Sequence, residues 1–120
     1  MYRIFKTTEL LKCSTVNKLV KKNNIIKLDL IILDLEGMEY EVLDGTNFDK
    51  LDVKAVLIEC RSHNIMPIMD KMYSEDFITA KNFSNFNKSN SSNWDGTNQD
   101  YLFIKKNFLK FIFNKNNKKL

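Results

Sequence analysis

The chain has 120 residues, of which 43% are hydrophobic and 28% are charged, with a formal net charge of +4. This length allows one domain, and this apolar content excludes a chain that is disordered throughout. Two cysteines, Cys13 and Cys60, are too few and too distant for a zinc knuckle, and no apolar run reaches the ~18–20 residues of a membrane-spanning helix.

The N-terminal segment 1–13 alternates polar and apolar residues and lacks the apolar core of a secretory signal peptide. We therefore expect a reduced, soluble, cytoplasmic protein. The first predicted helix follows this segment. Its N-cap is Ser14 or Thr15, and its apolar stripe consists of Val16, Leu19 and Val20.

A continuous apolar run predicts a strand from Leu28 to Leu33. Because the run does not alternate, we expect both faces of this strand to be covered, as in a parallel sheet. Acidic residues appear where the strand ends, at Asp34 and Glu36. In open α/β sheets, ligands bind at this carboxyl end of the strands.

A short helix is predicted after these acids. Met38, Val42 and Leu43 would face the sheet, and Glu39 would lie in the first turn, where the helix dipole favours an acidic side chain. Gly45 is expected to close the helix in the left-handed conformation.

The rest of the chain predicts one more helix and three more strands. Pro67 is favourable at the first position of a helix, and residues 88–99, rich in Asn and Ser, indicate an exposed connection. In order, the expected elements are a turn at Phe48–Leu51, a strand at Val53–Glu59, a helix from Pro67, a strand at Phe77–Phe86 and a last strand at Asp100–Ile104.

The central acidic pattern also carries a family resemblance. Asp34-x-Glu36-Gly37-x-Glu39, followed by Val42-Leu43-x-Gly45, resembles the signature of the FkbM-type methyltransferases, which use S-adenosylmethionine. The strand that ends in Glu59 resembles the next strand of that family. Weaker similarities follow the family's order at Thr15–Leu19 and Asp100–Ile104, so the resemblance covers about residues 15–105.

The resemblance implies an α/β fold that contains part of a Rossmann-like methyltransferase sheet, mostly parallel and ending in an antiparallel pair. It also implies O-methylation of a small molecule or a sugar. However, Gly37, Gly45 and Gly96 are the three glycines of the chain, and they do not form the glycine-rich turn that lets a backbone approach a nucleotide.

The resemblance begins midway through the family pattern. Three missing strand–helix units of ~30 residues each would account for roughly ninety residues. We therefore expect residues 1–106 to be the C-terminal half of a methyltransferase domain, truncated and inactive alone. A basic and aromatic tail, residues 107–120, follows it.

We expect the chemistry to be carried by three carboxylates, Asp34, Glu36 and Glu59. A carboxylate at this rim can orient an acceptor hydroxyl or take its proton. Asp34 and Gly37 are also expected to contact the methyl donor. The alternative is that Asp34 and Glu36 bond to backbone N–H groups and only shape the turn, that Gly37 only permits a tight turn, and that Glu39 caps the helix.

The strands that end at Asp34 and Glu59 would bring their carboxylates within roughly 5 Å laterally if the strands are neighbours. Such an acidic pocket, with His63 beside it, offers the hard oxygen ligands of a divalent cation. The spacing matches no defined ligand pattern, so we predict no metal. His63 is either solvated or a base, and Cys60, which follows an apolar strand, is predicted to be a buried thiol.

Two other functions stay open. In the first, the chain is a non-catalytic module that self-associates, or binds a missing N-terminal half on another chain, through the exposed edge of the strand Leu28–Leu33. In the second, the tail binds an anionic membrane surface or nucleic acid, although no nucleic-acid module is recognisable. The alternative for the tail is loose packing, and Trp94 either touches a substrate or anchors its loop.

Overall fold

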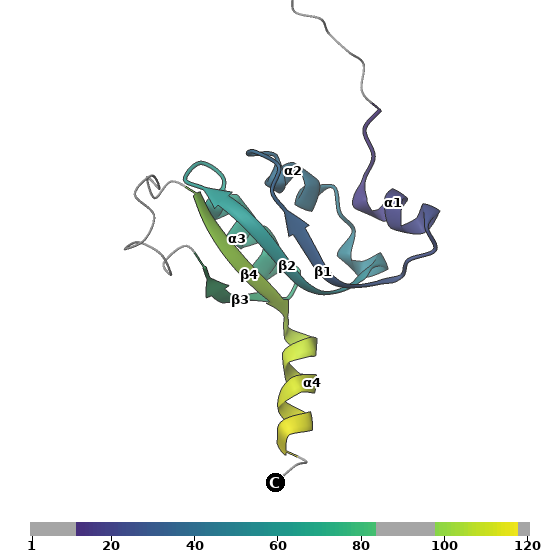
Figure 1. The fold of residues 1–120 in the computed structure, drawn as a ribbon, viewed down its shortest axis with the longest axis vertical. Coiled ribbons are helices and arrows are strands. Elements are labelled where there is room, and N and C mark those ends of the chain that lie inside the picture. Colours follow the sequence, from purple (N-terminus) through teal and green to yellow (C-terminus); the bar gives the residue numbers. More distant parts are fainter. Residues whose placement is uncertain (1–11, 84–97, 118–120) are drawn as a thin grey trace, which may run out of the picture.

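The computed structural model describes residues 12–83 and 98–117, and Figure 1 shows their fold. Trp94 and most of the expected connection lie outside the described residues. In chain order the elements are α1 (Val16–Lys22), β1 (Lys27–Leu33), α2 (Glu39–Asp44), the 3₁₀ turn η1 (Phe48–Lys50), β2 (Asp52–Arg61), α3 (Ile65–Ser74), β3 (Phe77–Asn82), β4 (Asn98–Lys105) and α4 (Lys106–Asn117).

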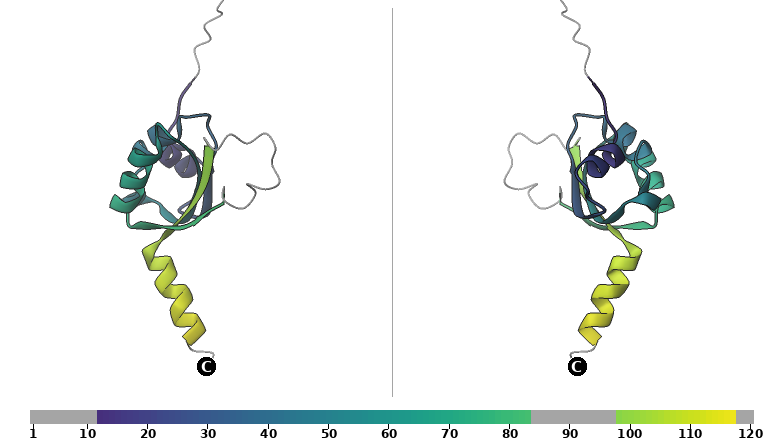
Figure 2. Two further views of the ribbon diagram at one scale, coloured as in Figure 1. Left: turned by 90° about the vertical axis from the view of Figure 1, so that its left-hand side faces the viewer. Right: turned by 90° about the vertical axis from the view of Figure 1, so that its right-hand side faces the viewer.

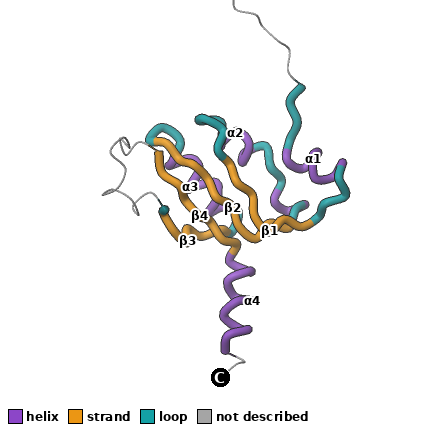
Figure 3. The backbone as a smooth tube through the Cα atoms, in the orientation of Figure 1, coloured by secondary structure: helices purple, strands orange, loops and turns teal. Residues whose placement is uncertain are grey.

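The strands form one mixed sheet in the order β1-β2-β4-β3, so the fold is α/β as predicted (Figure 3). β1 and β2 are parallel, whereas β4 pairs antiparallel with both β2 and β3. The sheet was expected to be mostly parallel, and this expectation is wrong, because β1 and β2 are the one parallel pair among the described strands. The reason is that β4 inserts between β2 and β3, and apolar periodicity carries no information on where a strand inserts or which way it runs.

One face of the sheet is covered by α2 and α3, which lie on the same side of it (Figure 2). Alternate residues of β2 point into this layer, and Val56, Ile58 and Cys60 are at most 1% exposed. Cys60 is thus a buried free thiol, as the sequence predicts. The other large side chains of this core are Leu43, Ile68, Met72, Phe77 and Phe103.

The outer edge and the opposite face of β1 are not covered by the described residues. β1 is the edge strand of the sheet, and Leu30 and Ile32 are 46% and 63% exposed. The prediction that both faces of this strand are buried is wrong. The strand has the composition of a buried strand, but among the described residues no strand lies on its outer side and no helix lies over Leu30 and Ile32.

The helix boundaries follow local signals in part. Thr15 caps α1 and accepts a hydrogen bond from the Lys18 N–H at 3.3 Å, as predicted. Gly45 is not left-handed, because its φ is −77° and the chain continues through a further turn into η1. Pro67 is the third residue of α3 rather than the first, since Asn64 occupies the N-cap position.

α4 occupies most of the segment expected to be a tail. It follows β4 directly and projects away from the sheet (Figures 1 and 2). Within the described residues, no helix has the length and apolar content needed to cross a membrane.

Candidate functional site at the carboxyl ends of β1 and β2

The chain makes a tight turn where β1 ends and α2 begins. Glu36 and Gly37 both have positive φ values, 54° and 107°. A φ of 107° strains any residue with a Cβ, so this position requires glycine. Gly37 therefore permits the strand-to-helix turn, as the sequence predicts. A Cβ at Gly37 would lie 3.7 Å from Nε2 of His63, so this exposed histidine borders the same turn.

Glu39 holds this turn together from inside. Its side chain is fully buried, and Oε1 accepts hydrogen bonds from the N–H groups of Leu35 at 2.7 Å and Gly37 at 3.3 Å. Burial alone would raise the pKa of Glu39, but the backbone N–H donors and the nearby Arg61 outweigh it and hold the pKa below its usual value. Glu39 is thus an ionised structural carboxylate.

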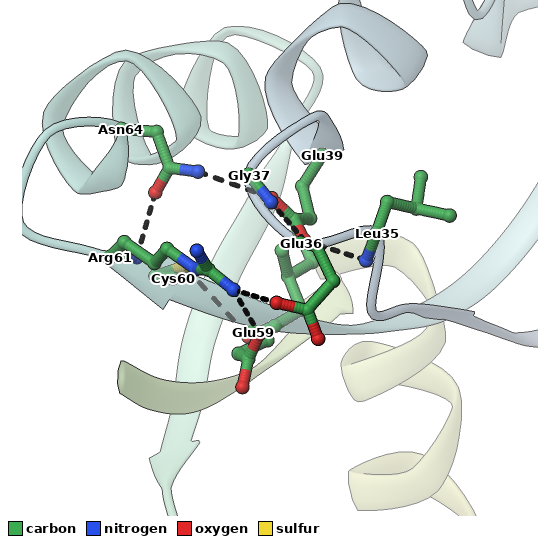
Figure 4. A network of polar contacts seen from close by, with 9 residues as sticks. Leu35, Glu36, Gly37, Glu39, Glu59, Cys60, Arg61 and Asn64 are labelled. Carbon is green, nitrogen blue, oxygen red and sulfur yellow. Dashed lines mark hydrogen bonds and ion pairs between the residues drawn. The ribbon is translucent and has the colours of Figure 1, made fainter. Parts of the chain in front are cut away.

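Asn64 connects this turn to the next one along the sheet. Its side-chain amide donates to Oε2 of Glu39 at 3.2 Å, and its Oδ1 accepts from the backbone N–H of Arg61 at 2.8 Å (Figure 4). The sequence analysis did not identify Asn64. A signal was present, because an asparagine just before an apolar helical run is a typical N-cap.

Two of the three predicted carboxylates come together. Oxygens of Asp34, Glu39 and Glu59 all lie within 4.8 Å of one another. Asp34 and Glu59 meet because β1 and β2 are parallel neighbours in the register Leu33 to Ile58, so both strands end at the same rim. Three carboxylates at this spacing are common without an ion, and one of them, Glu39, already has its oxygens bonded within the protein.

Glu36, the third predicted carboxylate, turns to the side and forms an ion pair with the Arg61 guanidinium (Figure 4). Arg61 Nη2 also lies 3.8 Å from Oε2 of Glu59. The sequence analysis missed Arg61. Its position two residues after Glu59 on one strand places both side chains on the same face, and this alternation is the signal that could have found it.

Glu59 is a mostly buried carboxylate whose charge Arg61 compensates in part. Its side chain is 20% exposed, and within the described part of the chain its Oε2 is buried without a hydrogen-bond donor. Burial, followed by the negative charge of Asp34, raises the pKa of Glu59, while Arg61 opposes this and Glu36 and Asp100 add to it. A carboxylate with a raised pKa at a ligand-binding rim is suited to accept a proton.

The described residues do not fit a complete nucleotide cradle. They contain glycine only at positions 37 and 45, on either side of α2. Neither belongs to a glycine-rich turn between a strand and a helix N-terminus that could hold a nucleotide closely. The rim therefore offers carboxylates, and the described residues offer no glycine-rich turn for a nucleotide.

One of three comparisons with known proteins found a match. A family model described as the methyltransferase FkbM domain matches residues 3–93, which is well over half of the chain. No curated protein and no solved structure matches the chain.

Proposed function

We propose that this chain, which belongs to the FkbM methyltransferase family, forms the acceptor side of a site that methylates an oxygen of a small molecule or a sugar. The observation that supports this most directly is the meeting of Asp34 and Glu59 at the carboxyl ends of two parallel strands. Ligands bind at this rim in open α/β sheets.

In this proposal Glu59 takes the proton of the acceptor hydroxyl; a bound sulfonium donor would supply the methyl group to the hydroxyl oxygen, with its S–C bond breaking and a neutral thioether leaving. The charge of Asp34 raises the proton affinity of Glu59, and Asp34 itself, exposed at the rim, orients the hydroxyl. Glu36 and Arg61 close one side of the rim with their ion pair. Positioning of the acceptor provides much of the catalysis, because methyl transfer requires little covalent chemistry from the protein.

The proposed donor is S-adenosylmethionine, as the family implies. Asp34 and Gly37 are proposed to border it. Since the chain carries no glycine-rich turn, we propose that a donor-binding unit with such a turn joins it, either as a preceding part of a longer protein or as a separate polypeptide.

The test is calorimetry with S-adenosylmethionine, followed by transfer of a labelled methyl group to pools of sugars and small hydroxylated molecules. We expect no measurable donor binding by the chain alone. Donor binding and transfer should appear when the chain is produced together with the polypeptide encoded immediately upstream. Absence of transfer in that combined preparation, with both components folded, contradicts the proposal.

A second candidate function is a non-catalytic module that binds through its sheet edge. The observation in its favour is the apolar surface of the edge strand β1, where Leu30 and Ile32 are strongly exposed. An edge strand of this kind pairs readily with a strand of another chain.

This candidate makes a separate prediction. The purified chain should self-associate in sedimentation velocity, and the double substitution Leu30→Lys and Ile32→Lys should make it monomeric, because lysine on an edge strand opposes pairing. Met66→Lys is the matched control, since Met66 is equally exposed, at 65%, but lies on α3. A wild-type chain that stays monomeric at high concentration contradicts this candidate.

A further inference from the structure

α4 is an amphipathic helix whose apolar side has no partner among the described residues. Only its first turns contact the domain, where Phe108 lies 5.4 Å below the Lys54 ammonium. Beyond that point Phe111, Ile112 and Phe113 are 56%, 36% and 65% exposed. Figure 1 shows the helix projecting from the end of β4, so it does not lie over the sheet.

The junction with β4 holds α4 in this direction. No loop separates Lys105 from Lys106, and the backbone N–H of Lys106 donates to the Asp76 carbonyl at 2.9 Å. The Lys106 ammonium also lies 3.9 Å from the Asp76 carboxylate. The backbone N–H and the ammonium of Lys106 both contact Asp76. α4 therefore cannot fold back onto the sheet of its own chain without breaking these contacts.

The charges of this segment all have one sign. Residues 106–120 contain five lysines and no acidic residue. Helical spacing places Phe108, Phe111 and Ile112 on one side of α4, and Lys106 and Lys110 on the other. Lys115 extends over the Phe111 ring, 5.1 Å from its centroid, in the way that a lysine stem covers apolar surface while its ammonium reaches a polar layer.

The carboxylates of the rim lie at the opposite end of the sheet. β4 is antiparallel to β2, so α4 leaves the sheet near Lys54, whereas the carboxylates of Asp34 and Glu59 lie at the far end of the strands. Glu59 lies five residues beyond Lys54 on β2, a distance of roughly 16 Å along the strand. This exceeds the Debye length of ~8 Å in physiological salt. The rim carboxylates therefore do not oppose an anionic surface at α4, and Asp76, an acid beside the start of the helix, is paired with Lys106.

We propose that α4 binds the surface of a membrane that contains anionic phospholipids. Phe111 and Ile112 enter the boundary between headgroups and acyl chains, and the lysines contact the lipid phosphates. A helix of 12 residues is about 18 Å long, too short to span a bilayer of ~30 Å, so α4 lies in the interface.

Two other partners fit the observations less well. A second copy of α4 would bring lysines against lysines, with no acidic residue in the segment to pair them. Nucleic acid would attract the lysines, but it offers no apolar surface to Ile112 and Leu109. A bilayer interface satisfies both the charge and the apolar side of the helix.

The experiment is co-sedimentation of the full chain with vesicles. We expect binding to vesicles of phosphatidylcholine containing about one third phosphatidylserine, and weak binding to phosphatidylcholine alone. The double substitution Lys110→Gln and Lys115→Gln should weaken binding roughly 25-fold, or about fivefold per lysine. Phe111→Ser should weaken it roughly tenfold.

Met66→Ser is the matched control, because Met66 is a large apolar side chain that is 65% exposed, against 56% for Phe111, and it lies on a different helix; its replacement should leave vesicle binding unchanged. The substituted side chains are exposed, so all variants should fold, as circular dichroism can verify. The proposal is overturned by equal binding to both vesicle types, by no binding, by a Met66→Ser effect as large as that of Phe111→Ser, or by α4-dependent dimers or DNA complexes in place of vesicle binding.

Discussion

Replacement of Glu39 with alanine should lower the free energy of unfolding by about 3–4 kcal/mol. The substitution leaves the partly buried N–H groups of Leu35 and Gly37 and the buried amide of Asn64 without their shared acceptor. Each unsatisfied buried donor costs about 1–3 kcal/mol, and not all of these costs add in full because the turn can relax toward water. Urea denaturation at neutral pH measures the effect.

Glu41→Ala is the matched control, since Glu41 lies in the same first turn of α2 but is exposed. Its replacement should change the free energy of unfolding by less than about 0.5 kcal/mol. Glu39→Gln should fall between the two, because the amide oxygen still accepts one backbone hydrogen bond. A Glu39→Ala chain as stable as Glu41→Ala would show that the turn is held by other contacts.

The same carboxylate makes stability depend on pH. Because the pKa of Glu39 is lower in the folded chain than in the unfolded chain, its ionised form contributes stability above the unfolded pKa. That contribution is lost as the pH falls through the folded pKa. The difference in unfolding free energy between wild type and Glu39→Ala should therefore shrink as the pH is lowered from 7 into the acid range below ~4.

The secondary structure was predictable where the signal is local. Three predicted features depend on a few adjacent residues, and each is present in the structure. They are the N-cap at Thr15, the apolar strand β1 and the turn at Phe48. The prediction that Gly45 ends α2 in the left-handed conformation is wrong, because the chain continues from α2 into η1. This path of the chain depends on how η1 packs and not on the glycine.

The sheet was less predictable because its arrangement depends on distant residues. The apolar run of β1 indicates that this strand is suited to burial on both faces. It does not indicate which elements cover the strand, and among the described residues Leu30 and Ile32 are left exposed. The insertion of β4 between β2 and β3 is decided by side-chain packing, for example Phe103 opposite Val56, and leaves no mark in the alternation of either strand.

The site could be predicted in part, from the rule that neighbouring parallel strands end at the same edge of a sheet. That rule brought Asp34 and Glu59 together correctly. It did not indicate which carboxylate would be neutralised, because the pairing of Glu36 with Arg61 and the burial of Glu39 depend on the exact path of two turns. The consequence is that Arg61 pairs closely with Glu36 and compensates the charge of Glu59 only in part.

Replacement of Glu59 with glutamine should have opposite effects on methyl transfer and on stability. In the combined preparation that transfers a methyl group, loss of the proposed base should reduce the rate about 10²-fold or more. The wild-type rate should fall as the pH is lowered through the raised pKa of Glu59, since only the ionised carboxylate accepts a proton. Asp70→Asn, on the exposed side of α3, is the control and should leave the rate unchanged.

The stability of the Glu59→Gln chain provides a readout that does not require a donor. The pKa of Glu59 is raised in the folded chain, so ionisation at neutral pH disfavours folding, and this penalty grows as the pH rises through the folded pKa. Glutamine has no charge to desolvate, and its amide can donate to the adjacent oxygens of Asp34 and Glu39. We expect the free energy of unfolding to increase by about 0.5–1 kcal/mol. A clear decrease would mean that Glu59, like Glu39, is held in place to support the fold, and the role of proton acceptor would then have to pass to another group at this rim.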